Sequence, residues 1–347
     1  MEPGRPRGVR LRPGAVGARS ARRGPVTSVG GEPPLVSVVT SAYNVGRYVR
    51  RSLDSVLGQD LEDLELIVVD DGSTDETTRY LEEVEREDRR VRLYRRTNQG
   101  LTAALVLGCS VSRGRYIARH DADDLSLPGR LRKQAGLLSS EPSLSLVSCH
   151  AYVVGPDGEL LLEEEGPTAT AEATEALRSR GRGPNGHGSA MFRADDYRAV
   201  GGYRGPFRFA QDWDLWLRLT ERGGFAFVPE FLYAYRYEER GISAVRKRQQ
   251  QALYELAMAA REARAAGASE DDILAQAATV STRTGPPGAG ALPGSYFIGK
   301  CLLDRRDRRA LRYLTACRRE APLSPRVWLA LAAAALLCDT TGQTVGG

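Results

Sequence analysis

The chain has 347 residues, of which 41% are hydrophobic and 27% are charged, a balance typical of soluble globular proteins and unlike that of disordered, collagen-like or membrane-embedded chains. Its net charge of +5 equals the excess of seven arginines over two glutamates within residues 1–32, so the rest of the chain is neutral and gives no indication of nucleic-acid binding. The five cysteines lack CxxC spacing and are odd in number, which argues against a closed disulfide framework and predicts free thiols.

Residues 1–32 are rich in Gly, Pro and Arg and show no apolar periodicity, so we expect a disordered basic tail. A tail of this kind could contact nucleic acid or anionic lipid, but we interpret it as a solvated extension. No uninterrupted apolar stretch of the sort that marks a signal peptide precedes Leu35. We therefore expect a cytoplasmic protein with, at most, peripheral contact at the inner face of a membrane.

Apolar runs and helical spacings alternate through the next part of the chain. The runs predict strands at residues 35–40, 64–69, 91–94 and 115–119. The spacings between them predict helices at residues 45–59, 74–87 and 101–112. Strands that are apolar throughout and alternate with helices indicate an α/β, Rossmann-like fold, with a mostly parallel central sheet and helices on both faces.

Polar residues follow three of these strands, at residues 40–44, 70–75 and 120–124. Ligands of such sheets bind beyond the carboxyl ends of the strands, so we expect the three loops to converge on one crevice. The first loop contains Tyr43, whose aromatic face could stack on a nucleotide base.

Asp71, in the second loop, could accept a hydrogen bond from a base N–H. It precedes a Gly-Ser-Thr sequence in which Ser73 or Thr74 would cap the next helix. Helix capping alone is the alternative explanation for Asp70 and Asp71.

Asp121 and Asp123, separated by Ala122, place two carboxylates on one side of an extended turn. Such oxygen ligands suit Mg²⁺ or Mn²⁺, and the cation would bridge a diphosphate. The alternative is a capped loop that leads into a helix beginning near residues 127–128, with proline in its first turn. Arg119 precedes the loop and could either bind phosphate or form a salt bridge with the acidic loop.

Asp212 stands at the start of a predicted helix that residues 213–219 would anchor in the core. One carboxylate suffices to take the proton of an acceptor hydroxyl, and we expect the helix N-terminus to keep it ionised. Its alternative role is N-capping, and Asp214 is the alternative base. His187 and Trp213 are candidates for the acceptor side, although a lone histidine is more often structural.

Beyond about residue 245 the sequence has Ala, Arg and Leu at helical spacing, interrupted by a Gly-Pro-rich stretch at residues 284–290. Helices are predicted at residues 296–303, 308–317 and 327–338. The last is well short of the ~20 residues that span a bilayer, so we expect a packed helix. This region could dock a partner, but we favour a structural role.

Several motifs now stand in a recognisable order, and together they resemble the family 2 glycosyltransferases of the glycosyltransferase A fold over about residues 35–245. The matching strings are VSVVTSAYN, LIVVDDGSTD, NQGLTAAL, GRYIARHDADD, HGSAMFRADDYRAVGGYR and AQDWDLWLRL. The resemblance implies that Asp212 is the catalytic base and that Asp121 and Asp123 bind the metal and the diphosphate. It also implies that Tyr43 and Asp71 contact the base of the nucleotide.

The nucleotide sugar is accordingly expected to lie against a set of residues from the strand-end loops. The set comprises Thr40, Ser41, Tyr43, Asn44, Asp71, Asn98, Gly100, Arg119, Asp121, Ala122 and Asp123. Many members of the family have an asparagine where this chain has Val106, which removes one contact on the donor side.

The resemblance implies an inverting, metal-dependent transfer from a nucleoside-diphosphate sugar, with UDP as the default nucleotide, to a hydroxyl of an unidentified acceptor in cell-surface polysaccharide or glycoconjugate biosynthesis. A Gln-X-X-Arg-Trp segment, typical of polymer-making members, is absent from the sequence, which favours addition of a single sugar. The alternatives are a nucleotidyltransferase and a non-catalytic nucleotide-sugar-binding protein of the same fold. We expect a tail at residues 1–32, a catalytic domain at 33–245 and a helical region at 246–347.

Overall fold

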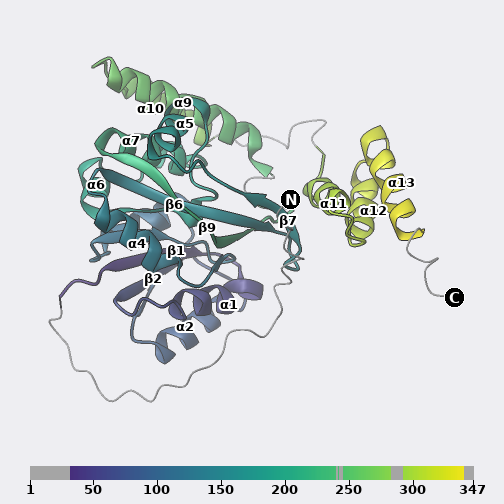
Figure 1. The fold of residues 1–347 in the computed structure, drawn as a ribbon, viewed down its shortest axis with the longest axis horizontal. Helices are drawn as coiled ribbons and strands as arrows, with labels where there is room; N and C mark the ends of the chain where they lie inside the picture. The colour runs from purple at the N-terminus through teal and green to yellow at the C-terminus, as the bar shows by residue number, and fades with distance from the viewer. Residues whose placement is uncertain (1–31, 240, 242–244, 283–291, 340–347) are drawn as a thin grey trace, which may run out of the picture. The chain divides into compact units, whose positions relative to one another are not determined.

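The computed structural model describes residues 32–239, 241, 245–282 and 292–339. The predicted disordered tail and the predicted Gly-Pro break at residues 284–290 lie outside the described residues, apart from residue 32. Within the described chain nine strands form one sheet, in the order β3-β2-β1-β4-β8-β6-β9-β5, with β7 paired to β6 (Figure 1). The strands are β1 (Val36–Ala42), β2 (Leu64–Asp70), β3 (Val91–Arg95), β4 (Tyr116–Arg119), β5 (Leu125–Ser126), β6 (Leu144–Val154), β7 (Leu160–Glu164), β8 (Met191–Arg193) and β9 (Gly224–Arg236).

The four strands predicted from the first part of the sequence form the parallel half of this sheet. β1 pairs in parallel with both β2 and β4, and β2 pairs in parallel with β3. The other half is mixed, because β8 runs antiparallel to β4 and β6, while β6 and β9 are parallel. The predicted α/β fold with a mostly parallel sheet is confirmed, and the antiparallel strands are additions that the sequence pattern did not indicate.

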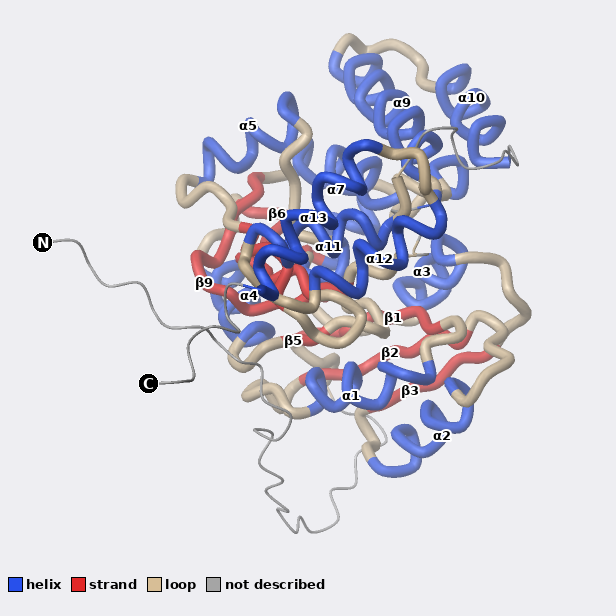
Figure 2. The backbone as a smooth tube through the Cα atoms, turned by 90° about the vertical axis from the view of Figure 1, so that its right-hand side faces the viewer, coloured by secondary structure: helices blue, strands red, loops and turns tan. Residues whose placement is uncertain are grey.

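Helices cover both faces of the sheet, as predicted. Val36 and Val38 of β1 pack in a core with α1, α2 and α4, whereas Val39, which points the other way, packs in a second core with α3, α5 and α7. Figure 2 shows α1 and α2 on one side of β1–β3 and α3 on the other. The helices are α1 (Gly46–Leu57), α2 (Thr77–Glu87), α3 (Leu101–Ser110), α4 (Arg130–Ser140), α5 (Thr170–Arg180), α6 (Ala194–Ala199) and α7 (Gln211–Arg222), with short 3₁₀ turns η1 (His187–Ser189) and η2 (Gly205–Phe207).

Two predicted helix starts are wrong. The helix expected near residues 127–128 begins at Arg130, because Leu125 and Ser126 pair with β9 and hold the chain extended, and Gly129 then turns it with a φ of +83°. The helix expected from residue 74 begins at Thr77. Its first N–H donates to the carboxylate of Asp75 at 3.0 Å, so neither predicted capping residue has that role.

The C-terminal helices pack as two groups. α9 (Lys247–Ala265) and α10 (Asp271–Thr282) share a core with α7 and η2. α11 (Gly294–Asp304), α12 (Ala310–Glu320) and α13 (Pro325–Asp339) correspond to the three predicted helices and share a core with Val153 of β6 and Leu161 of β7.

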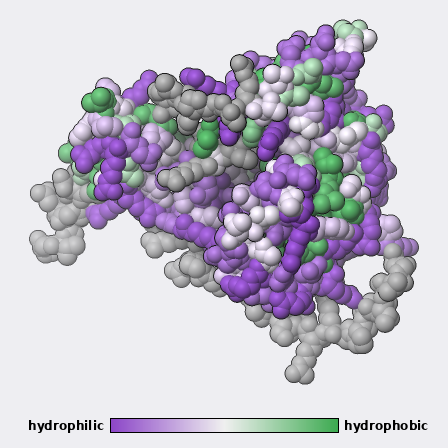
Figure 3. Space-filling view, turned by 180° about the vertical axis from the view of Figure 1, so that it is seen from behind, coloured by the Kyte–Doolittle hydropathy of each residue, from purple (hydrophilic) through white to green (hydrophobic). Residues whose placement is uncertain are grey.

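Among the described residues, no helix combines the length and apolar character needed to cross a membrane. The cysteines at positions 109, 149, 301 and 317 are free and buried, as predicted for them. On the face seen in Figure 3, apolar groups form small patches among hydrophilic ones.

Candidate active site

The loops that follow β1, β2 and β4 contact one another, so the predicted convergence is confirmed. The Thr40 hydroxyl donates to the carbonyl oxygen of His120 at 2.5 Å, joining the first loop to the fourth-strand loop. Asn44, which has a φ of +51°, accepts the Thr74 N–H on its Oδ1 at 2.8 Å and donates its own N–H to Ser73 Oγ at 3.2 Å. Polar groups of the three loops thus lie at one edge of the sheet.

On the donor side, Tyr43 keeps 48% of its surface exposed, which leaves a ring face available for a base. Ser41 is partly buried, and the side chain of Thr40 is fully buried and already bonded, so Thr40 holds the loop and does not face the crevice. The contact of Tyr43 and Ser41 with a nucleotide stays a prediction.

Asp71 has a use that the sequence did not indicate. Its buried carboxylate accepts the N–H of Gly100 at 2.7 Å and that of Gln99 at 3.1 Å, and Arg96 lies 3.2 Å away. Asp71 therefore fixes the segment before α3, where Asn98 is exposed and Gly100 adopts a φ of +89°. A contact of Asp71 with a nucleotide base would be additional to this structural role.

The acidic loop contains three aspartates in different surroundings. Asp121 forms an ion pair with Arg119 at 2.5 Å. Asp123 receives no hydrogen bond from the side chain of another described residue, and burial together with the charge of Asp121 raises its pKa to about 7. Asp124 is buried, accepts hydrogen bonds from Tyr233 Oη (2.8 Å) and from a backbone N–H (2.7 Å), and burial beside the other two acids raises its pKa well above the usual range.

Of the two roles predicted for Arg119, phosphate binding and a salt bridge with the acidic loop, the structure shows the salt bridge. Its guanidinium is fully buried and donates to the carbonyl oxygens of Val39 (2.6 Å) and His120 (3.0 Å) as well as to Asp121. Its Nε N–H donates to His187 Nε2 at 3.3 Å. Arg119 is thus enclosed by protein and orients Asp121, and Ala122, which is 3% exposed, likewise contributes to the shape of the loop and not to a contact surface.

His187 is held as a neutral acceptor. Its Nε2 also accepts the hydroxyl of Tyr203 at 2.7 Å. Burial, with the adjacent charge of Arg119, lowers the pKa of His187 well below its usual value. These contacts give His187 a positioning role next to Arg119 and make it unsuitable as an acid at neutral pH.

Asp212 lies in the first turn of α7, as predicted, but its electrostatics differ from the expectation. Its Oδ1 accepts the Trp213 N–H at 2.9 Å. Burial raises the pKa of Asp212 to about 6 in spite of this bond, and the charge of Asp121 adds to the rise. With this pKa Asp212 is still ionised at neutral pH, but the sequence did not indicate that desolvation outweighs the helix contribution and raises the pKa.

The alternative base, Asp214, is unavailable. It is 1% exposed, and its two oxygens are taken by Arg204 and Arg218, the latter at 2.5 Å. With both oxygens in ion pairs and almost no exposed surface, Asp214 is not accessible to an acceptor hydroxyl. Asp212 is the carboxylate at the start of α7 that remains available.

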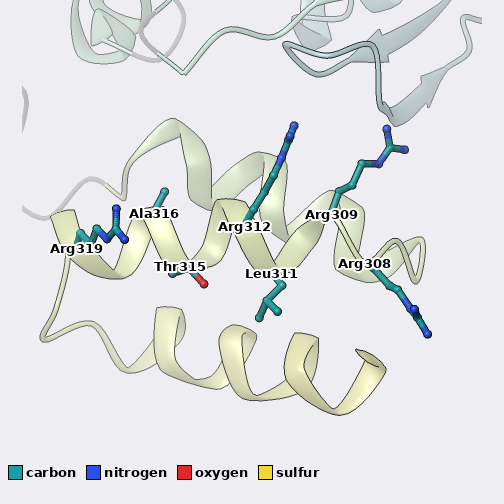
Figure 4. A pocket seen from close by; sticks show the side chains of 7 residues that line it. All are labelled: Arg308, Arg309, Leu311, Arg312, Thr315, Ala316 and Arg319. Atoms are coloured by element: carbon teal, nitrogen blue, oxygen red, sulfur yellow. The ribbon is translucent and has the colours of Figure 1, made fainter. Parts of the chain in front are cut away.

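A cavity of about 380 Å³ adjoins Asp212. It is lined by Arg180, Gly181, Phe209, Ala210, Asp212, Trp213, Lys247, Gln250, Gln251 and Tyr254. Of the two residues predicted for the acceptor side, Trp213 lines this cavity and His187 does not. A larger cavity of about 590 Å³ lies along α12 (Figure 4), but its lining contains no acid, and its Arg312 is paired with Asp157 and Glu159.

The donor atoms near the acidic loop fit a divalent cation. No group of three or more His, Cys, Asp or Glu side chains with metal-binding geometry occurs in the described part of the chain. Two carboxylates are nevertheless the protein ligands expected for Mg²⁺ or Mn²⁺ when a diphosphate and water supply the rest. The partly buried Asp123, with its raised pKa and no cationic partner within ion-pair distance among the described residues, is the kind of carboxylate that a cation would stabilise.

Sequence reasoning missed the support that β9 gives to this loop. Tyr233 Oη accepts the Asp121 N–H at 3.1 Å while it bonds Asp124. Arg236 donates to the carbonyl oxygens of Asp123 (3.1 Å) and Gly155 (2.8 Å). The Tyr-Ala-Tyr-Arg sequence at the end of β9 was the available signal, but its partners in the acidic loop are more than 100 residues away.

Comparisons with known proteins identify the family of this chain. A family model described as glycosyl transferase family 2 matches residues 37–201. The putative glycosyltransferase EpsE of Bacillus subtilis is 37% identical over 212 residues, which cover 58% of this chain and 73% of that protein. The O-antigen biosynthesis glycosyltransferase WbnJ of Escherichia coli is 31% identical over 186 residues, covering 53% of this chain and 71% of that protein.

Solved structures show the same fold. A mannosyltransferase from Pyrobaculum calidifontis in complex with GDP-Man and Mn²⁺ has a TM-score of 0.51 at 19% identity, covering 88% of this chain and 86% of its own. S. aureus TarS residues 1–349 in complex with UDP-GlcNAc has a TM-score of 0.55 at 16% identity, with coverages of 86% and 88%.

Proposed function

This chain belongs to glycosyl transferase family 2 and is a glycosyltransferase that uses a nucleotide sugar, and from that premise we propose that it moves a single sugar from a UDP-sugar to an acceptor hydroxyl with inversion. The observation that carries this proposal is the neighbourhood of Asp212 and the acidic loop. Burial raises the pKa of Asp212 to about 6, and the charge of Asp121 adds to this rise. The candidate base therefore lies close enough to the candidate diphosphate site to be influenced by its charge.

The residues suggest how the transfer proceeds. The acceptor hydroxyl oxygen attacks the anomeric carbon, its proton passes to the Asp212 carboxylate, and the bond from the anomeric carbon to the diphosphate oxygen breaks with the electron pair leaving on the diphosphate. A pKa of about 6 leaves Asp212 ionised at neutral pH while keeping it basic enough to take the proton. Because Asp214 is bound by two arginines, Asp212 acts without a second base from α7.

Asp121 and Asp123 would hold Mn²⁺ or Mg²⁺, which when bound neutralises charge on the leaving diphosphate. Arg119 keeps Asp121 in place through a buried ion pair, and Arg236 fixes the backbone of Asp123. On the other side of the donor, Tyr43 offers its exposed ring to the base, and Asp71 holds the segment of Asn98 and Gly100. Mn²⁺ in the mannosyltransferase complex and UDP-GlcNAc in the TarS complex support this choice of cation and nucleotide by analogy of fold.

The biosynthetic setting that we propose is cell-surface polysaccharide or glycoconjugate assembly, in line with the role of the related WbnJ in O-antigen biosynthesis. We place the reaction in the cytoplasm, with peripheral contact at the membrane. Three apolar side chains at the end of the described chain support that contact, since Leu323 is 93%, Leu329 74% and Trp328 48% exposed. Arg318 lies over the Trp328 ring at 5.2 Å, which sets a basic group beside an aromatic one as at lipid interfaces.

A donor screen tests the reaction. Purified protein is incubated with UDP-, GDP- and dTDP-sugars in Mn²⁺ or in EDTA, and release of the nucleoside diphosphate is measured. We expect release from a UDP-sugar in Mn²⁺ and its loss in EDTA, and proton NMR of the product should show the anomeric configuration inverted. Undiminished turnover in EDTA would remove the metal from the proposal, and a retained configuration would remove the single-displacement mechanism.

A further inference from the structure

The cavity beside Asp212 has walls from three parts of the chain that are distant in sequence. Arg180 and Gly181 come from the end of α5, Trp213 from α7, and Lys247 and Tyr254 from α9. At about 380 Å³ it lies in the lower part of the ~300–1,000 Å³ range of small-molecule sites. Since a base must touch the hydroxyl that it deprotonates, the molecule that fills this space is the acceptor, provided that the proposed transfer is correct.

Aromatic rings form one side of the cavity. Trp213 packs edge-on against Tyr254, with ring centroids 5.0 Å apart, and against Trp216 at 5.4 Å. Gly181 has a φ of +61°, and a side chain there would meet the Tyr254 hydroxyl at 2.6 Å, so the glycine is needed for this close approach. Rings fixed by such contacts are suited to pack on the apolar face of a sugar ring.

The charges of the lining are unbalanced. Asp212 is its sole acid, whereas Arg180 and Lys247 are basic. Within the described residues, neither of these two cations has an ion pair or a side-chain hydrogen bond. Other basic residues of the same region are paired, as Arg204 is with Asp214 and Arg264 with Glu221.

Two further arginines add to the positive potential at this cavity. Arg208 and Arg246 lie over the ring of Phe209, at 5.7 Å and 5.5 Å, and neither forms an ion pair with a described carboxylate. Four cations around one acid attract an anion, and cations close to a low-dielectric wall are screened less than those on an open surface. An uncharged acceptor would leave this concentration of charge without a partner.

We propose that the acceptor is a glycan or glycoside that carries an anionic group, a carboxylate or a phosphate, with Arg180 and Lys247 binding that group and Trp213 and Tyr254 packing on the sugar. This inference rests on the proposed transfer reaction and adds the class of acceptor to it. The anionic group sits at the Arg180 and Lys247 side of the cavity, and a hydroxyl of the same sugar unit faces Asp212.

The test compares matched acceptors. Aryl glucosides, aryl glucuronides and glucose phosphates are offered with the active donor, and kcat/KM is measured for each at 50 and 300 mM NaCl. We expect a charged acceptor to be preferred over the neutral one by about 10-fold or more, with the preference falling at high salt because screening weakens the attraction. A comparison of the aryl glucuronides with the glucose phosphates shows whether a carboxylate or a phosphate is recognised.

Variants then identify the cations. In the double variant Arg180→Gln, Lys247→Gln we expect the ratio of kcat/KM for the charged to the neutral acceptor to fall about 10-fold. Arg248→Gln, an exposed change next to Lys247 but outside the lining, should leave the ratio as in the parent. A neutral acceptor that equals or exceeds every charged one, charged glycosides that are not used at all, or an unchanged ratio in the double variant would overturn the proposal.

The proposed transfer itself is checked separately by hydrolysis of the donor in the absence of acceptor, with Mn²⁺ present. Hydrolysis with no preference for charged acceptors means that the acceptor inference is wrong and the enzyme assignment stands. Absence of both hydrolysis and transfer with every donor means that the proposed reaction is wrong.

Discussion

Replacing Asp212 by asparagine should inactivate the enzyme and at the same time stabilise its fold. The carboxylate is buried enough that its pKa is raised from 3.8 to about 6, so the folded protein pays a free-energy cost for ionising it. Asparagine has nearly the same shape, and its Oδ1 can still accept the Trp213 N–H that the aspartate accepts at 2.9 Å. The substitution thus removes the charge and the base while it keeps the local hydrogen bond.

The expected gain in stability follows from the shift in the pKa of Asp212. A rise of about two pH units corresponds to ~3 kcal/mol at full burial, and residual solvent exposure of Asp212 reduces this to about 1–2 kcal/mol. Since the folded-state pKa is raised, the folded protein binds the proton more tightly than the unfolded chain, so the cost is absent below pH 3.8, grows between pH 4 and 6, and is complete above pH 6. Turnover should fall by ~10²–10⁴, the usual contribution of a general base.

Urea unfolding at pH 4.5 and pH 8, in EDTA, measures the stability difference between the variant and the parent, and nucleoside diphosphate release in Mn²⁺ measures turnover. The exposed Asp195→Asn is the matched control, because that side chain is 97% exposed and should change neither quantity. A gain in stability equal at both pH values would refute the electrostatic reasoning. Turnover above a tenth of the parent value would exclude Asp212 as the base.

Further outcomes follow from the same site. The kcat/KM of the parent should rise with unit slope as the pH increases towards about 6, where Asp212 loses its proton, and a profile flat between pH 5 and 7 would contradict this. Tyr43→Ala should weaken UDP binding by about 1–3 kcal/mol in calorimetry, the value of one base stack, and unchanged affinity would place the base elsewhere. Asp123→Ala should lower the affinity for Mn²⁺ and for UDP together by about 10-fold, and loss of neither would remove the metal assignment. Trp328→Ala combined with Leu329→Ala should reduce co-sedimentation with anionic vesicles, and equal binding to zwitterionic vesicles would refute the electrostatic part of membrane contact.

The parallel half of the sheet could be predicted because its information is local. Apart from Glu65, the run from Leu64 to Val69 is apolar, and it is followed by the polar residues that end a buried strand. The start of α4 could not be predicted, since Leu125 is held extended by Ala234, a partner 109 residues further along the chain. A proline near a helix start is a valid local signal, but here a distant strand determines the conformation before it.

The candidate active site, too, has features that could be predicted from the sequence and features that could not. The identities of the acids at positions 121, 123 and 212 were evident from the motifs, whereas their protonation depends on burial, which is a tertiary property. The sequence left open whether Arg119 binds phosphate or the acidic loop, and complete burial of its guanidinium decides for the loop. The raised pKa of Asp212 was missed for the same reason, because a helix terminus can be recognised in a sequence and desolvation cannot.

The three aspartates of the acidic loop show how a site for a cation can be stable before the cation binds. Three adjacent negative charges would repel one another strongly in a buried loop. Arg119 compensates Asp121, and burial beside Asp123 and Asp121 favours the neutral form of Asp124, although the hydroxyl of Tyr233 donates to its carboxylate. Asp123 forms no ion pair among the described residues, and its pKa, raised to about 7, leaves it only partly ionised at neutral pH. The metal-free loop thus carries little uncompensated charge, and a divalent cation that arrives with a diphosphate finds one carboxylate ready to ionise fully and a second already oriented.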